Sequence, residues 1–226
     1  MIFVSATGTE VGKTAVSRGI ARAWARRGPA AALKPFETGV DPVAMDARSL
    51  ARACGRPELA SHPGFYRAKR PLAPWAATLE GEAPPDIDAA LAAVRELAIP
   101  ERTLVEGAGG VLVPMDAERT MLDVASALGA HLLLVAADTL GVLSYTLTAV
   151  AEARRAGLVP RVVVLTRPTP EARLSHATNA RILEAKLGLP LRVLPHLEGL
   201  EDDARGDDRL ADAVLEAGIV DLVESA

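Results

Sequence analysis

The chain has 226 residues, of which 50% are hydrophobic and 24% are charged, so it can form one α/β domain with a substantial core. Its formal net charge of −4 argues against a dedicated nucleic-acid binder, because such proteins are usually basic. Cys54 is the only cysteine, which excludes an intramolecular disulfide and a cysteine-based metal cluster. A signal peptide is not visible before the first apolar run, and Asp138, Thr139 and Gly141 interrupt the most apolar stretch, residues 132–151. We therefore expect a cytoplasmic protein without a membrane span.

Strand-like and helix-like segments alternate along the chain. Short apolar runs predict strands at residues 2–5, 31–35, 102–106, 132–137, 161–166 and 191–195. Alanine-rich amphipathic stretches predict helices at residues 14–27, 44–54, 86–98, 120–129, 142–156 and 171–187. The proline-rich segment 57–85 is expected to be a long irregular loop. This alternation predicts an α/β fold with a mainly parallel central sheet, helices on both faces, and a single domain spanning residues 1–226.

A phosphate-binding loop is the most informative motif. Residues 6–14 read A-T-G-T-E-V-G-K-T and lie between the first predicted strand and the first predicted helix. Glycine lets backbone N–H groups turn toward a phosphate, and the helix N-terminus adds donors and partial positive charge. Lys13 would reach the outer phosphates, and the Thr14 hydroxyl would bind Mg²⁺. The alternative is an ordinary glycine-containing turn, since Thr7 stands where the first glycine of the motif belongs. The strand-to-helix context favours a P-loop NTPase-like fold.

Two further strand ends carry polar residues. In parallel sheets, ligands bind beyond the carboxyl ends of the strands, so these residues are expected near the phosphate loop. Lys34, one of only four lysines, ends the second strand; it could neutralise phosphate charge or be an ordinary solvated lysine. Glu106 ends the third strand, where phosphate-loop enzymes place a Mg²⁺-binding carboxylate. The glycines of the following segment, 107–110, are expected to bring backbone close to an anion. Asp46 begins the second helix and, by itself, is more often a structural residue.

Together these segments resemble dethiobiotin synthetase over nearly the whole chain. The matching blocks are T-E-V-G-K-T at 9–14, K-P at 34–35, T-G at 38–39, Asp46, and V-E-G-A-G-G at 105–110. The resemblance implies an ATP-dependent ligase that closes the ureido ring of dethiobiotin from 7,8-diaminononanoate and CO2. One amine would form a carbamate, the γ-phosphate would convert it to a carbamic–phosphoric anhydride, and the second amine would close the ring. The resemblance also implies a homodimer, in which the substrate tail contacts the partner subunit near Leu143 and Ser144.

The resemblance assigns roles to individual residues. It implies that the Mg²⁺ ligands are Thr14, Asp46 and Glu106. It implies that Lys13 and Lys34 are the catalytic cations, and that the substrate contacts are Thr38, Lys34 and Gly109. The residues implied to contact ATP are Thr9, Glu10, Val11, Gly12, Lys13, Thr14, Ala15, Asp46, Glu106, Gly107, Ala108, Gly109, Thr166 and Pro195.

The sequence departs from the family pattern at two positions. Ala6 replaces the outer glycine of the loop, which is harmless if that position has ordinary backbone angles. Thr166, followed by Arg167, stands where the family often has an asparagine that reads adenine. Threonine cannot offer the paired donor and acceptor of an amide, so the base preference stays open.

Two other functions remain as alternatives. An amide synthase domain of the cobyric-acid type has a similar loop, but those proteins usually carry a glutaminase domain, for which this chain has no room. A nucleotide-switched ATPase of the chromosome-partitioning type would carry an extra lysine early in the loop, where this chain has Gly8. The acidic net charge also disfavours DNA binding.

Overall fold

A sheet of six parallel strands forms the centre of the protein, and the computed structural model describes residues 1–171 and 175–224. The strands lie in the order β2-β5-β1-β6-β7-β8. Their bounds are Ile2–Ala6 (β1), Ala31–Leu33 (β2), Thr103–Glu106 (β5), His131–Ala137 (β6), Val162–Thr166 (β7) and Leu191–Leu194 (β8). The predicted fold class is confirmed, and each of the six predicted strands is present with small shifts at its ends. Because neighbouring strands are parallel, the ends of β1, β2 and β5 lie at the same edge of the sheet.

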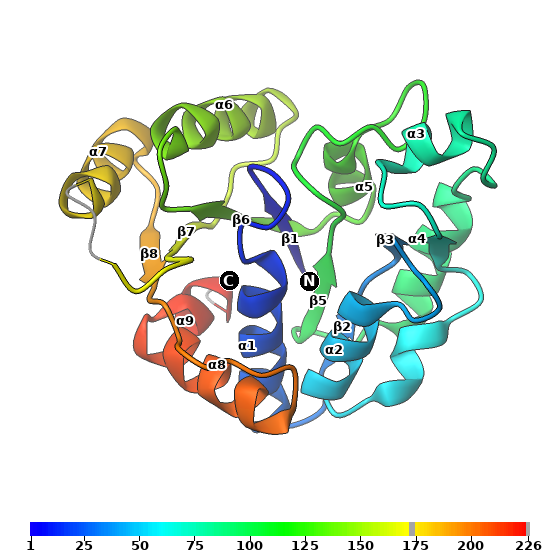
Figure 1. Cartoon of the computed structure of the whole chain (residues 1–226), viewed down its shortest axis with the longest axis horizontal. Coiled ribbons are helices and arrows are strands. Elements are labelled where there is room, and N and C mark those ends of the chain that lie inside the picture. Colours follow the sequence, from blue (N-terminus) through cyan, green and yellow to red (C-terminus); the bar gives the residue numbers. More distant parts are fainter. Residues whose placement is uncertain (172–174, 225–226) are drawn as a thin grey trace.

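Helices cover both faces of the sheet, as Figure 1 shows. On one side lie α1 (Lys13–Ala25), α8 (Ala204–Glu216) and α9 (Ile219–Glu224), with α2 (Met45–Ala53) beside α1. On the other lie α4 (Ile87–Leu97), α5 (Met121–Ala127), α6 (Val142–Arg155) and α7 (His176–Leu187). Of the predicted helix 171–187, residues 172–174 lie outside the described part, and α7 begins only at His176. None of the helices within 1–171 and 175–224 is long and apolar enough to cross a bilayer.

Two regions differ from the sequence-based expectation. The segment 57–85 was expected to be irregular, but it contains the 3₁₀ helix η1 (Pro57–Ser61), strand β4 (Tyr66–Ala68) and helix α3 (Pro74–Leu79). Strand β4 pairs in parallel with β3 (Phe36–Thr38) and forms a second, two-stranded sheet. The pairing involves residues about thirty positions apart, so no local pattern could reveal it. Helices α8 and α9 follow the last predicted strand, where no element was expected.

Helix α1 is the packing centre of its face. Val16, Ile20, Ala23 and Trp24, which form the apolar stripe of this helix, are all 1% exposed or less. A Cβ atom on Gly19 would lie 2.8 Å from the carbonyl oxygen of Leu210, so the missing side chain lets α8 approach α1 closely. The phosphate loop is thus followed by a helix that is packed between the sheet and a second helix.

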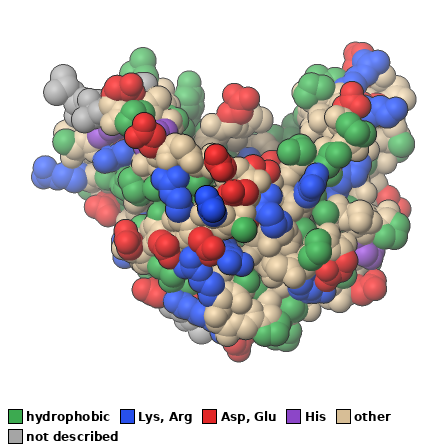
Figure 2. Space-filling view, turned by 60° about the horizontal axis from the view of Figure 1, so that its bottom comes forward, with side chains coloured by type: hydrophobic (Ala, Val, Ile, Leu, Met, Phe, Trp, Pro, Cys, Tyr) green, Lys and Arg blue, Asp and Glu red, His purple; other side chains and the backbone are tan. Residues whose placement is uncertain are grey.

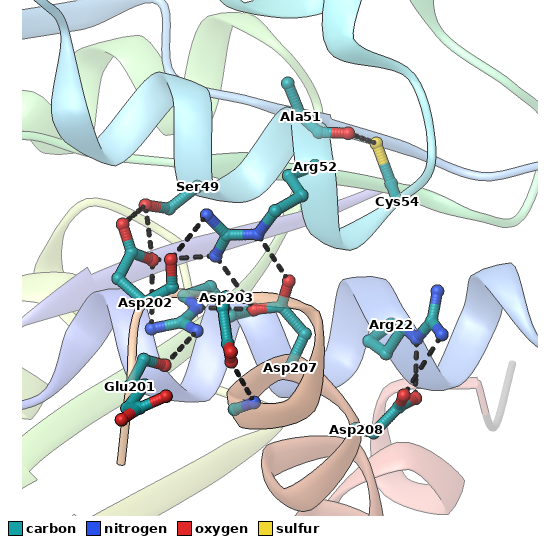
Figure 3. Close-up of polar contacts among 12 residues, drawn as sticks. Arg22, Ser49, Ala51, Arg52, Cys54, Glu201, Asp202, Asp203, Asp207 and Asp208 are labelled. Carbon is teal, nitrogen blue, oxygen red and sulfur yellow. Dashed lines mark hydrogen bonds and ion pairs between the residues drawn. The ribbon is translucent and has the colours of Figure 1, made fainter.

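A network of ion pairs joins α1, α2 and α8 (Figure 3). In the first turn of α8, Asp207 accepts hydrogen bonds from Arg18 Nε on α1 at 2.6 Å and from Arg52 Nε on α2 at 2.8 Å. Just before α8, Asp202 accepts from Arg52 Nη2 at 2.7 Å and from the Ser49 hydroxyl at 2.8 Å. The side chains of Arg18 and Asp207 are only 8% and 2% exposed, so this pair is largely removed from water.

We predict that Asp207→Asn lowers the free energy of unfolding by about 3 kcal/mol, because it removes the charge that pairs with Arg18 at 2.6 Å and with Arg52 at 2.8 Å, and leaves the buried Arg18 only the longer ion pair with Asp202 at 3.3 Å. The matched control is Asp212→Asn, since Asp212 also pairs with an arginine, Arg26, which directly follows α1, but the Asp212 side chain is 62% exposed. The control should cost at most about 1 kcal/mol. Urea unfolding of both variants measures the difference, and equal losses would show that burial of the Asp207 pair is unimportant.

Candidate active site

The phosphate loop begins at the end of β1 and leads directly into α1. Ala6 is the last residue of β1, is fully buried, and accepts a hydrogen bond from the Val111 N–H at 3.0 Å. Alanine therefore replaces the expected glycine at a position with regular strand geometry. Further along the loop, Glu10 and Gly12 have φ values of 56° and 85°. Gly12 has a further reason to be glycine, because a Cβ atom there would lie 3.0 Å from the Thr166 side chain.

Lys34 connects the two acidic residues beside the loop. Its Nζ atom lies 2.5 Å from Glu106 Oε1 and 3.1 Å from Asp46 Oδ2, and it also donates to the carbonyl of Gly107 at 3.1 Å. Burial by itself would lower the pKa of Lys34, but the two carboxylates outweigh this effect and hold the pKa above its usual value. Lys34 is therefore not the solvated lysine that the sequence left as an alternative, since its side chain is 4% exposed.

Glu106 reaches the phosphate loop from the end of β5. The side chain is fully buried, and its Oε1 atom accepts a hydrogen bond from the Thr14 hydroxyl at 3.1 Å. Its Oε2 atom is buried and has no hydrogen-bond partner among the residues that the structure describes. Next to it, burial lowers the pKa of Lys13, and the Glu106 carboxylate partly offsets that shift. The ends of β2 and β5 and the starts of α1 and α2 thus place two ammonium groups and two carboxylates close together.

Three of these groups, those of Lys13, Lys34 and Asp46, line a cavity of about 350 Å³. The lining residues are Thr9, Glu10, Gly12, Lys13, Thr14, Ala15, Lys34, Phe36, Glu37, Thr38, Asp46, Ala108 and Gly109. A second cavity, of about 490 Å³, shares Glu10, Gly12 and Ala15 with the first and extends past Val11 to Thr166 and Pro195. The structure therefore arranges the residues expected to contact ATP along two adjoining cavities, except that Glu106 and Gly107 lie beneath the first cavity.

The glycines that follow β5 serve two different purposes. A Cβ atom on Gly107 would lie 3.0 Å from the Phe3 ring, and one on Gly110 would lie 3.1 Å from the Ala6 carbonyl oxygen. These two glycines let the segment pack closely against β1, which is a reason for glycine that the sequence analysis did not give. Gly109 has a φ of 61° and lines the first cavity, so its conformation and position fit the expected backbone approach to a bound anion.

Thr166, the last residue of β7, holds the phosphate loop in place through its side chain. Its side chain is largely buried, and its hydroxyl donates a hydrogen bond to the Val11 carbonyl oxygen at 2.7 Å. This contact fixes the loop at the residue before Gly12. The hydroxyl is thus already engaged with the protein backbone, although the residue also lines the second cavity.

The donor set beside Lys34 fits a magnesium ion. Within 1–171 and 175–224, no group of three or more His, Cys, Asp or Glu side chains is arranged to hold a metal. Mg²⁺ does not need such a group, because it is usually held by one or two carboxylates, water and substrate phosphates. Thr14, Asp46 and Glu106 supply hard oxygen atoms, and the unpartnered Oε2 atom of Glu106 is an available ligand.

Glu37 is a cavity residue that the sequence analysis did not select. It lies between Lys34 and Thr38 on strand β3, is 7% exposed, and lines the first cavity. Burial raises the pKa of its carboxyl group, against the effect of two backbone N–H donors from Ala47 and Asp46. The only available signal was an acidic residue in an otherwise apolar strand end, and that pattern has no specific meaning without the fold.

Comparison with known proteins agrees with this geometry. A family model described as an AAA domain matches residues 1–204. The solved structure of the cell division ATPase MinD from Pyrococcus furiosus superposes with a TM-score of 0.57, covering 99% of this chain and 95% of that chain at 18% identity. That likeness concerns the fold alone. The family-model match, the parallel sheet and the loop before α1 together define the chain as a protein of the P-loop NTPase class.

Closer relatives identify the family. The ATP-dependent dethiobiotin synthetase BioD of Caulobacter vibrioides (strain NA1000 / CB15N) is 40% identical over 204 residues, which is 86% of this chain and 88% of that protein. The enzyme of the same name from Caulobacter sp. (strain K31) is 37% identical over 217 residues, covering 93% and 94% of the two chains. The chain belongs to the family of ATP-dependent dethiobiotin synthetases, which are ligases.

The position of Thr166 predicts that Thr166→Val weakens binding of ATP, CTP and GTP by a similar factor. The substitution keeps the shape of the side chain and removes the hydrogen bond to Val11, which should also lower stability by about 1 kcal/mol. Competition binding with the three nucleotides measures the ratios of their affinities. A changed ratio would contradict this expectation and would show that the hydroxyl reads the base.

Proposed function

We propose that the protein closes the ureido ring of dethiobiotin from 7,8-diaminononanoate, CO2 and ATP in the presence of Mg²⁺. One amine of the substrate attacks CO2 and forms a carbamate. A carbamate oxygen attacks the γ-phosphorus, which releases ADP and forms a carbamic–phosphoric anhydride. The second amine attacks the carbonyl carbon of the anhydride, and phosphate leaves as the ring closes. Since the reaction consumes ATP and small metabolites, we place the protein in the cytoplasm.

The observation that carries this proposal is the convergence of Lys34, Glu106 and Asp46 beside the phosphate loop. Phosphoryl transfer needs chiefly positioning and neutralisation of charge, which two buried ammonium groups can supply. Lys13 lies at the start of α1, where it would contact the outer phosphates. Lys34 faces the same cavity and would bind the carbamate and the transferring phosphoryl group. A bound Mg²⁺ would neutralise phosphate oxygens, with Thr14, Asp46 and Glu106 as its protein ligands.

The remaining cavity residues suit the other substrate groups. Thr38 and Gly109 also line the first cavity, and we assign them to the diamine. The second cavity begins at Glu10 and Val11 and would hold the base near Thr166 and Pro195. This assignment places the triphosphate across the loop, with its reactive end beside Lys34.

We expect purified protein to form dethiobiotin and phosphate in equal amounts only when the diamine, CO2 and ATP are all present. Lys13→Ala should lower kcat by about 10²–10³-fold, because it removes a charge that stabilises the transferring phosphoryl group. Lys186→Ala is the control, since Lys186 lies on α7 and lines none of the described cavities next to the loop. Unchanged turnover in the Lys13 variant would contradict the proposed role of this lysine in phosphoryl transfer.

We also propose that the active form is a homodimer, with α6 at the contact. Exposed apolar residues gather at the start of this helix and beside the loop: Leu140 is 93% exposed, Tyr145 is 61% exposed, and Leu112 is 49% exposed. Leu143 and Ser144 lie in the same region and line a cavity with Leu140. A partner subunit placed there would lie close to Thr9 and Gly110, which border an adjoining apolar groove.

Leu140→Asp should therefore shift the protein toward a monomer in sedimentation equilibrium and raise KM for the diamine. A charged group at this position would have to be buried against an apolar partner surface. Leu79→Asp is the matched control, because Leu79 is also an exposed leucine, at 72%, but lies on α3. If the dimer persists in the Leu140 variant and dissociates in the control, the subunit contact does not involve α6 and lies on another surface.

The two alternative functions receive less support. An amide synthase acting on a corrinoid would need an ammonia source, and it should release phosphate with that substrate and not with the diamine. A DNA-binding ATPase would need a basic surface, whereas the face shown in Figure 2 interleaves Lys and Arg with Asp and Glu side chains. ATP-dependent DNA retention in a gel-shift assay would be the result that favours the partition-type alternative.

A further inference from the structure

The N-terminus of α2 is capped by a residue from a different element. The N-cap position is Ala44, whose side chain has no acceptor atom. Glu37 on β3 instead accepts hydrogen bonds from two backbone N–H groups in the first turn of α2. Its Oε1 atom accepts from the Asp46 N–H and its Oε2 atom from the Ala47 N–H, both at 2.9 Å. Both oxygen atoms of one buried carboxylate thus hold the backbone of Asp46 and its neighbour.

This cap determines what the Asp46 side chain can do. An aspartate in the first turn of a helix can turn back and accept from the free N–H groups of that turn. Glu37 already accepts from two of these donors, the N–H groups of Asp46 and Ala47, so these two N–H groups are not available to the Asp46 carboxylate. Its Oδ2 atom lies 3.1 Å from Lys34 Nζ, and the side chain is 42% exposed beside the first cavity.

Glu37 is itself held firmly in place. It lies opposite Arg67 in the β3–β4 ladder, and Arg67 donates to the Lys34 carbonyl at 2.9 Å and to the Ala60 carbonyl at 3.1 Å. The second sheet therefore fixes the backbone of both Lys34 and Glu37, and with it the point from which the Glu37 carboxylate reaches α2. A rigid support of this kind can set the position of a side chain to which it is joined.

We propose that Glu37 is a positioning residue that keeps the Asp46 carboxylate directed at the site of Mg²⁺ and Lys34. The inference rests on the proposed role of Asp46 as a metal ligand. It adds an explanation of why the Asp46 carboxylate is free to bind the metal. Glu37 acts through Asp46 and does not bind the metal or the nucleotide itself. Without Glu37, the Asp46 carboxylate folds back onto the N-terminus of its own helix.

A double-mutant cycle tests this inference. The variants are Glu37→Ala, Asp46→Ala and the double variant, and the readout is the Mg²⁺ concentration that gives half-maximal binding of a fluorescent ATP analogue. Glu37→Ala should raise this concentration by about tenfold, as expected for loss of a residue that orients a metal ligand. In the Asp46→Ala background the same substitution should have no further effect, because the side chain it positions is gone. Glu37→Gln, which keeps one acceptor oxygen, should give an intermediate value.

Asp86→Ala is the matched control for the loss of a helix cap. Asp86 caps α4 by accepting from the Ala89 N–H at 2.9 Å, and it lines no part of the first cavity. It should lower thermal stability without changing the Mg²⁺ requirement. If Glu37→Ala does not fold, the cycle is run with Glu37→Gln. An unchanged Mg²⁺ requirement in the Glu37 variants, or an equal rise in both backgrounds, overturns the inference.

The same experiment separates this inference from the proposed function. Binding of the ATP analogue needs neither the diamine nor CO2. If the wild type binds nucleotide with the expected cycle but forms no dethiobiotin, the positioning role of Glu37 stands and the proposed reaction fails. If the wild type forms dethiobiotin and the cycle is additive, the reaction stands and the role of Glu37 fails.

Discussion

The contact of Lys34 with Glu106 and Asp46 is the interaction on which the site depends. A fully buried glutamate is costly unless a cation accompanies it, and Lys34 supplies that cation at 2.5 Å. The three residues come from the end of β2, the end of β5 and the start of α2, so the ion cluster exists only when these elements are correctly assembled. It also keeps two acidic groups and a lysine in place beside the phosphate loop, so little rearrangement is needed when a nucleotide binds.

The fold could be predicted from the sequence because its signals are local. Each buried strand is a short apolar run, and the phosphate loop identifies the junction of β1 and α1 without any tertiary information. Helices α8 and α9 were missed because the preceding segment is rich in acidic residues and reads as a loop. The structure shows that those acids have partners: Asp207 and Asp202 face arginines of α1 and α2, which are more than one hundred residues away.

The site could be predicted only in part, for a similar reason. Lys13, Thr14 and Glu106 follow from motifs with a known chemical purpose, and Lys34 and Asp46 gained their roles from the family resemblance. Glu37 could not be found in this way, since its importance comes from two hydrogen bonds to a helix that begins several residues later. For the glycines after β5, the sequence predicted only a close approach to a ligand. The structure adds that two of the three make room for β1, and sequence alone cannot separate close packing from ligand binding.

The order of the elements along the chain affects how the protein is made. Helix α1 is among the first segments to leave the ribosome, yet its outer surface is covered by α8, which lies near the other end of the chain (Figure 1). During synthesis Arg18 therefore has no Asp207 to pair with, and the face of α1 that carries Arg18 and Gly19 stays uncovered, until almost all of the protein has been translated. A nascent or truncated chain that ends before residue 204 would carry the complete phosphate loop on an unsupported helix, and such a chain is a natural target for chaperones.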